Sequence, residues 1–206
     1  MSPAAAGPAA DRKVGPGAFV AVVGASGVGK DSLIAYAAGR LGPLVMVPRR
    51  VITRPAGPGE DHLPVTKDEF ANALAEGAFA CHWDAHGLRY GLPACVDDVV
   101  RDGRVVVANV SRTVLDDLAG RYDDLRVVLV TAAERVRAHR LSRRGRETRD
   151  EVTRRLDRDD PAPGHKADLT IINNGSLAEA GDVLTTFLEP TGEMSRTIRA
   201  EVDATA

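Results

Sequence analysis

The sequence predicts one α/β domain with a mainly parallel central sheet. Three observations indicate this class. Short apolar runs of strand length alternate with segments of helical periodicity. The chain has 206 residues, which suits one domain with extensions better than two domains. Its residues are 44% hydrophobic and only 4% aromatic, so we expect a core built mostly from Val, Leu, Ile and Ala.

Each element follows from a local pattern of apolar and turn-forming residues. We expect strands at 19–23, 44–47, 51–53, 78–83, 88–90, 104–110, 125–130 and 169–172. We expect helices at 30–40, 67–76, 94–101, 132–143, 147–159 and 177–188. Thr66 and Glu69 form a capping-box pattern before the second helix, and His86-Gly87 predicts a hairpin turn. Residues 1–17 and 190–206 lack such patterns and are expected to be tails, the first of them disordered.

Composition argues against several classes of protein. The 27 basic residues against 29 acidic ones give a net charge of -2, which argues against a general nucleic-acid binder. No run approaches the roughly 18 apolar residues that a membrane span requires. The two cysteines, Cys81 and Cys95, lack metal-ligand spacing and form no disulfide framework. We therefore expect inert thiols in a reducing, cytoplasmic setting.

A phosphate-binding loop follows the first expected strand. Residues 24–32 match G-x-x-x-x-G-K between a strand and a helix. Glycines let the backbone approach an anion, and N–H groups at the helix start point at phosphate oxygens. Lys30 adds a positive charge for the terminal phosphates. The pattern predicts that ATP is bound by the whole loop, which comprises Gly24, Ala25, Ser26, Gly27, Val28, Gly29, Lys30, Asp31 and Ser32.

Asp31 departs from this pattern, because Ser or Thr normally stands there and binds Mg²⁺ through its hydroxyl. A carboxylate is also a good ligand for Mg²⁺. We predict that Asp31 binds the metal directly or through water. In the alternative, Ser32 contributes to the metal site and Asp31 is a charge favoured at the start of a helix.

The order of motifs resembles that of the guanylate kinases over residues 19 to 188. A closer set resembles the ribose 1,5-bisphosphate phosphokinases, and its motifs are Gly29–Ser32, Arg50–Arg54, Glu60–His62, His86–Gly91, Asn109–Arg112 and Arg144–Glu147. The resemblance implies a three-layer P-loop kinase fold of the guanylate-kinase type at 18–189. It also implies a small acceptor-binding subdomain at about 48–92 and an Arg-rich lid at about 140–156.

The same resemblance implies an enzyme that uses ATP and Mg²⁺. Its reaction would convert ribose 1,5-bisphosphate, a phosphorylated sugar, to 5-phosphoribosyl 1-diphosphate, with release of ADP, in phosphonate breakdown. Two alternatives stay open at this point. One is a guanylate or other nucleoside monophosphate kinase, and the other is a guanylate-kinase-like interaction module without catalysis.

Departures from the guanylate-kinase pattern favour a sugar bisphosphate over a nucleotide as acceptor. The glutamate that reads guanine in that family falls at Cys81, which cannot supply a carboxylate. Their Thr-Ser after Tyr-Gly is replaced by Leu92-Pro93. Their acidic Asp-x-Asp is replaced by Asn109-Val110-Ser111-Arg112, and no Asp or Glu occurs from Arg104 to Leu115. The expected site has lost acceptors for a base and gained cationic donors.

We expect three arginines to share the two acceptor phosphates, and several neighbours to assist them. The arginines are Arg50, Arg54 and Arg112, and the other candidate substrate-binding residues are His62, Arg89, Tyr90, Asn109 and Ser111. For three of them a structural role is the alternative. His62 would bond within its loop, Arg89 would be a solvated charge and Tyr90 would pack in the core, as we expect Trp83 to do.

The Arg-rich segment after the seventh expected strand, at 125–130, suits a lid. Residues 134–160 hold ten arginines and seven acidic residues, so an exposed pair of salt-bridged helices is the alternative. The resemblance places lid arginines at Arg140, Arg144 and Arg155, which with Lys30 are the candidate catalytic residues. Such cations would stabilise the charge on the migrating phosphoryl group. Asn173 and Asn174 end the last strand near the expected position of adenine.

Overall fold

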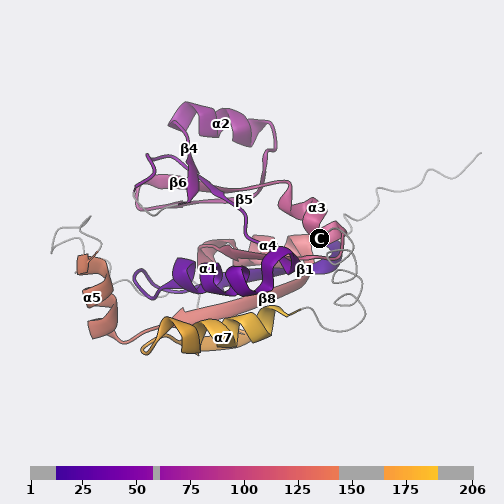
Figure 1. Cartoon of the computed structure of the whole chain (residues 1–206). Coiled ribbons are helices and arrows are strands. Elements are labelled where there is room, and N and C mark those ends of the chain that lie inside the picture. The colour runs from indigo at the N-terminus through magenta and orange to yellow at the C-terminus, as the bar shows by residue number, and fades with distance from the viewer. Residues whose placement is uncertain (1–12, 58–60, 144–164, 190–206) are drawn as a thin grey trace, which may run out of the picture.

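The protein folds around a five-stranded parallel sheet with a smaller four-stranded sheet above it, as the computed structural model shows (Figure 1). The structure describes residues 13–57, 61–143 and 165–189. The large sheet has the order β2-β7-β1-β8-β9, and every pairing in it is parallel. Its strands are β1 (Val14–Val23), β2 (Val45–Met46), β7 (Val105–Asn109), β8 (Tyr122–Thr131) and β9 (Leu169–Ile172). The expected parallel sheet is confirmed.

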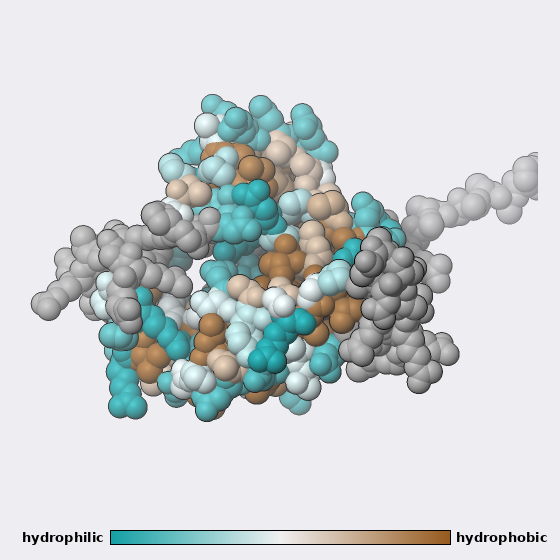
Figure 2. Space-filling model, in the orientation of Figure 1, coloured by the Kyte–Doolittle hydropathy of each residue, from teal (hydrophilic) through white to brown (hydrophobic). Residues whose placement is uncertain are grey.

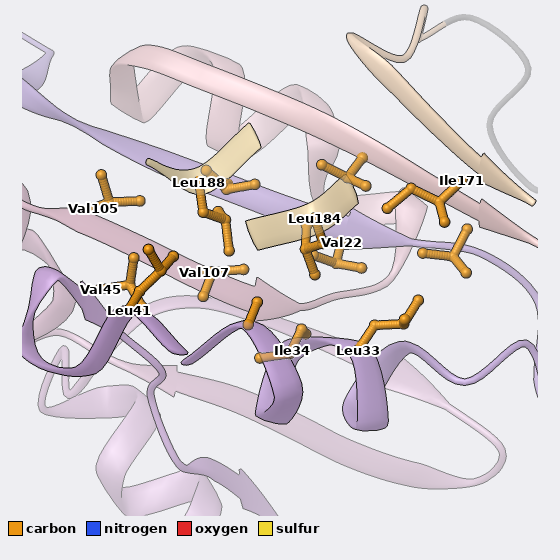
Figure 3. Close-up of a cluster of buried hydrophobic side chains, with 14 of the residues drawn as sticks. Val22, Leu33, Ile34, Leu41, Val45, Val105, Val107, Ile171, Leu184 and Leu188 are labelled. Carbon is orange, nitrogen blue, oxygen red and sulfur yellow. The ribbon is translucent and has the colours of Figure 1, made fainter. Parts of the chain in front are cut away.

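Alternation of side chains along β1 divides the core into two layers. Val20 and Val22 pack on one face of the sheet with residues of α1 (Lys30–Leu41) and α7 (Leu177–Leu188), as Figure 3 shows for Val22, Leu33 and Leu184. Residues Phe19 and Ala21 face the other side. There they pack with α3 (Val96–Arg101) and α4 (Leu115–Arg121). The large sheet is thus the middle of three layers.

The smaller sheet has the order β4-β3-β6-β5 and mixed pairing. Its strands are β3 (Arg50–Ile52), β4 (His62–Pro64), β5 (Phe79–Ala85) and β6 (Leu88–Pro93). Only β3 and β4 run parallel, and β5 and β6 form the expected hairpin, in which His86 and Gly87 have φ angles of 58° and 72°. Helix α2 (Lys67–Ala75) begins at the expected capping box and covers this sheet (Figure 1).

Several element boundaries differ from expectation. Strand β1 begins at Val14, where Val14 pairs with Tyr122, so the expected boundary of the N-terminal tail at residue 17 was wrong. Strand β4 lies in a segment without alternating apolar residues, and α4 has only seven residues, too few to show a helical period. Tertiary pairing and burial produced both elements. The expected helix at 147–159 and the expected C-terminal tail lie outside the described residues.

Helix α5 (Glu134–Arg143) follows β8 and stands beside the end of the large sheet (Figure 1). Two short 3₁₀ turns, η1 (Gly42–Leu44) and η2 (Arg112–Val114), complete the described elements. None of the helices within the described ranges is long and apolar enough to cross a membrane.

Candidate active site at the phosphate-binding loop

The glycines of the loop adopt backbone conformations that the pattern requires. Gly24, Gly27 and Gly29 have φ angles of 144°, 82° and 96°. These angles lie in the region that residues with a Cβ rarely adopt. A Cβ on Gly24 would also lie 2.2 Å from the carbonyl oxygen of Val130 in β8. The loop conformation therefore depends on glycine at the end of β1.

The loop presents both a cation and a helix N-terminus. Lys30 is the first residue of α1, and its ammonium donates to the carbonyl oxygens of Gly24 at 2.7 Å and Ala25 at 3.1 Å. Gly29 is the N-cap of α1, and no side chain caps the helix. The first N–H groups of such a helix suit an anion. This arrangement can bind phosphate groups, as the sequence predicts.

Helix α5 holds the loop from the other side. Arg137 donates to the carbonyl oxygen of Ser26 at 3.2 Å, and Arg140 donates to that of Val28 at 3.1 Å. Arg140 was expected as a lid cation, and in this structure it contacts the loop backbone. Arg137 was missed, although it lies three residues before Arg140 and thus on the same helix face. The other two lid candidates, Arg144 and Arg155, lie outside the described residues.

Asn173 also supports the loop. It is 2% exposed, and its amide donates to the carbonyl oxygen of Val28 at 2.8 Å. Its Oδ1 accepts from Arg140 at 3.4 Å, while Asn174 accepts from the backbone N–H of Ala133 at 2.7 Å. Both asparagines that were considered for adenine thus bond to the protein itself. The end of β9 fixes the loop and the start of α5.

Three predicted residues meet where the two sheets approach each other. Asp31 on α1 accepts hydrogen bonds at Oδ1 from Arg50 Nη2 at 3.2 Å and from Asn109 Nδ2 at 2.8 Å. Arg50 comes from β3 in the small sheet, and Asn109 ends β7 in the large sheet. Figure 2 shows the surface indented between the part that carries α2 and the part that carries α1 and α7. Arg50, which we expect on the acceptor side, is therefore bonded to the first turn of α1.

Other candidates lie in loops near this point with different partners. Arg54 is on the loop after β3 and donates to the carbonyl oxygen of Pro55 at 3.3 Å. Ser111 caps η2 by accepting from the N–H of Thr113 at 3.3 Å. Arg112, the first residue of η2, is half-buried, and burial lowers the pKa of its guanidinium.

His62 has the structural role that was its alternative. The side chain is buried, at 3% exposure, and its Nε2 lies 3.2 Å from the carbonyl oxygen of Arg54. His62 is in β4, which pairs with β3 at Arg50. The imidazole therefore supports the loop that carries Arg54.

Arg89 and Tyr90 point to opposite faces of the small sheet, because neighbouring side chains on a strand alternate. Arg89 lies over the ring of Phe70 in α2, at 5.8 Å, and pairs with Asp84 at 3.6 Å. Tyr90 stacks on Trp83 at 5.4 Å, on the face toward the large sheet. The structure thus brings Tyr90 to the side of Arg50 and places Arg89 on the α2 side.

A buried cysteine stands at the position where the guanylate kinases carry their guanine-reading glutamate. Cys81 is buried in β5, and burial raises its thiol pKa to about 12. Trp83 is also in the core, as expected, at 8% exposure. Within the described part of the chain, no group of three or more His, Cys, Asp or Glu residues could hold a metal ion. A metal at the loop would depend on Asp31, Ser32 and the phosphates.

Three relatives found by comparison with known proteins carry the same name. The chain is 62% identical over 172 residues to a ribose 1,5-bisphosphate phosphokinase of Pseudofrankia inefficax, covering 84% of this chain and 90% of the relative. It is 51% identical to one of a Chelativorans species, covering 81% and 82%, and 44% identical to one of Brucella melitensis, covering 87% and 94%. No family model matches the chain.

A solved guanylate kinase from Anaplasma phagocytophilum has the same fold, with a TM-score of 0.62 and 17% sequence identity. The match covers 87% of this chain and 89% of that structure. It confirms the expected guanylate-kinase-like α/β fold.

Proposed function

The chain belongs to the ribose 1,5-bisphosphate phosphokinase family, and we propose that it transfers the γ-phosphoryl group of ATP to the 1-phosphate of ribose 1,5-bisphosphate. The products are 5-phosphoribosyl 1-diphosphate and ADP, and the family resemblance links the reaction to phosphonate breakdown. One observation carries the proposal. The guanidinium of Arg50 donates a hydrogen bond of 3.2 Å to the carboxylate of Asp31 on the phosphate-binding helix. This contact sets an acceptor-side cation beside the donor loop.

The chemistry needs no general base. The nucleophile is an oxygen of the 1-phosphate, which is already anionic near neutral pH. That oxygen forms a bond to the γ-phosphorus while the bond to the β–γ bridging oxygen breaks, and ADP leaves with the electron pair. The barrier arises from repulsion between two anions, so the protein contributes orientation and positive charge.

The residues available for this task surround the loop. Lys30 and the N-terminus of α1 would hold the donor phosphates, while Arg50, Arg54 and Arg112 would hold the acceptor phosphates. Tyr90 faces the same side as Arg50. Asp31 or Ser32 would hold Mg²⁺, which supplies charge neutralisation at the triphosphate when bound.

Two further lid arginines would add positive charge around the migrating phosphoryl group. Arg140 contacts the loop backbone, and we propose that Arg144 and Arg155 act with it on the migrating phosphoryl group. In related phosphoryl-transfer enzymes, one such cation increases the rate by roughly 10³–10⁵. Removing the charge at any of these positions should lower turnover more than affinity.

The alternative of a nucleotide acceptor is disfavoured by the small sheet. A base-reading carboxylate would need to stand at Cys81, whose thiol is buried in the core. The alternative of a non-catalytic module is disfavoured by the phosphate-binding loop, which keeps Lys30 and its three positive-φ glycines, Gly24, Gly27 and Gly29.

A substrate panel tests the proposal. Purified protein with MgATP is offered ribose 1,5-bisphosphate, GMP or ribose 5-phosphate, and ADP release is followed. We expect ribose 1,5-bisphosphate to be used best, and Lys30→Met to abolish its use. A higher kcat/KM for GMP would reject the assignment, since GMP carries a base and a single phosphate.

A further inference from the structure

Asp31 stands where the pattern calls for a hydroxyl, and a carboxylate there has a cost. Its negative charge lies in the first turn of α1, next to Lys30 and the groups that bind a triphosphate. Repulsion between this carboxylate and the phosphates would weaken binding unless cations compensate it. The surroundings of Asp31 therefore decide what the residue does.

The structure gives Asp31 two donors on one oxygen. Oδ1 accepts from Arg50 and from Asn109, at 3.2 and 2.8 Å. These partners are 19 and 78 residues away in the sequence and come from different sheets. The carboxylate thus joins the phosphate-binding helix, the small sheet and the end of β7.

Arg50 is the member of this cluster whose orientation matters for an acceptor. Its side chain is 23% exposed, compared with 58% for Asp31. A guanidinium has five N–H donors in a rigid plane, so fixing one nitrogen fixes the direction of the others. Asp31 accepts from Nη2, so the directions of the other N–H groups of this guanidinium are also set.

We propose that Asp31 is a positioning residue, which orients Arg50 toward the acceptor phosphate and fixes the small sheet against the phosphate-binding helix. The ion pair also compensates the charge of Asp31, so that a carboxylate is tolerated beside the triphosphate. Ser32 then remains as the residue of the loop for the metal. This inference rests on the proposed function for the identity of the acceptor.

The neighbouring pair Arg49–Asp61 offers a matched control. Arg49 precedes Arg50, and its Nε lies 2.6 Å from Asp61 Oδ1 with both side chains exposed, at 60% and 79%. An exposed pair of this kind contributes little. Asp61→Asn removes an acidic partner from an arginine of the same segment without touching the helix.

The test is a double-mutant cycle with Asp31→Asn, Arg50→Ala and both together. Asp31→Asn keeps the shape of the side chain and removes its charge. We expect it to raise the KM for ribose 1,5-bisphosphate about ten-fold, with the KM for ATP and the dependence on free Mg²⁺ unchanged. In the Arg50→Ala background, the same change should have less than a two-fold effect, and Asp61→Asn should leave every constant within two-fold.

Three results would overturn the inference. They are a shift in the free Mg²⁺ requirement as the main effect of Asp31→Asn, additive effects of the two substitutions on the acceptor KM, or an unchanged acceptor KM. Circular dichroism at the assay temperature shows that each variant is folded. If the wild-type protein prefers another acceptor, the proposed function fails, and the same cycle with that acceptor still tests whether Asp31 acts through Arg50.

Discussion

Single side chains in the interior show how burial sets chemistry in this protein. Asp97 is 4% exposed and accepts hydrogen bonds from Arg121 at 3.0 Å and from the hydroxyl of Tyr122 at 2.8 Å. These bonds raise the pKa of Arg121, and burial with the bond to Asp97 raises that of Tyr122. The charge is tolerated in the core because it is paired.

The two cysteines should differ sharply in reactivity, so the expectation that both thiols are inert holds for Cys81 but not for the exposed Cys95. Cys81 is buried and its pKa is raised to about 12, whereas Cys95 is exposed. Because the thiolate is the reactive form, at pH 8 we expect a maleimide to label one thiol per native chain and two after unfolding. Mass spectrometry counts the labels, and Cys95→Ser should leave no native thiol reactive.

Two labels on the native chain would show that Cys81 is accessible and would contradict the burial argument. The raised pKa of Cys81 also sets the direction in which stability changes with pH. Cys81 contributes fully to stability below its ordinary pKa, and this contribution is lost as pH rises toward its folded value of about 12. Alkaline pH should therefore destabilise the protein through this residue.

At the scale of elements, the pair of helices on one face of the large sheet depends on a small residue. Gly181 in α7 faces Tyr36 of α1, and a Cβ there would lie 2.3 Å from the ring atom Cδ1. Ala37, Ala180 and Leu184 pack in the same cluster. Close approach of α1 and α7 therefore requires glycine at this position.

Alanine at two helical glycines should have opposite effects. Gly39→Ala, where nothing lies within 4 Å of the new Cβ, should stabilise α1 by up to about 1 kcal/mol. Gly181→Ala gains the same helix propensity but must displace Tyr36, so we expect a net loss of about 1–2 kcal/mol. Urea unfolding measures both, and equal effects would show that α1 and α7 do not pack as closely as described.

Some helix starts could be predicted from capping residues in the sequence. The capping box at Thr66 and Glu69 is present as expected, and Ser176 with Glu179 forms a second one at α7. Hydrogen bonds from Thr66 and Ser176 lower the pKa of both glutamates. Their contribution to stability is therefore present at neutral pH and is lost as pH falls through the lowered pKa.

At the scale of the whole molecule, the small sheet shares its core with the large one. Trp83 and Leu92 belong to the cluster that also contains Val110 and Leu115. Separating the sheets would expose these side chains to water, which is unfavourable for each. We infer that the small sheet is not an independently folding unit.

Trp83 makes this inference measurable, because it is the single tryptophan of the chain. In a urea titration, its fluorescence should change with the same midpoint as the far-ultraviolet circular dichroism, which reports mainly on the large sheet and its helices. A fluorescence midpoint at clearly lower urea would mean that the small sheet unfolds first. Adding ribose 1,5-bisphosphate should raise both midpoints together.

The amino-acid sequence alone was enough to predict the parallel α/β sheet, the loop between β1 and α1 and most helix ends. These features follow from local patterns, since apolar periodicity, glycine spacing and capping residues act over a few neighbouring positions. Gly24 and Thr66 are of this kind, since Gly24 adopts the positive φ and Thr66 forms the capping box that their neighbours in the chain predict. Lys30 begins the predicted helix after the loop.

Which candidate side chains lie together depends on contacts between elements that are far apart in the sequence. Arg50, Asp31 and Asn109 converge because β3, α1 and β7 are brought together by crossovers and strand register, over 19 and 78 residues of chain. His62 is buried beside the carbonyl oxygen of Arg54, and Arg89 lies toward α2 because side chains alternate along β6. Local spacing carries no information about such pairing.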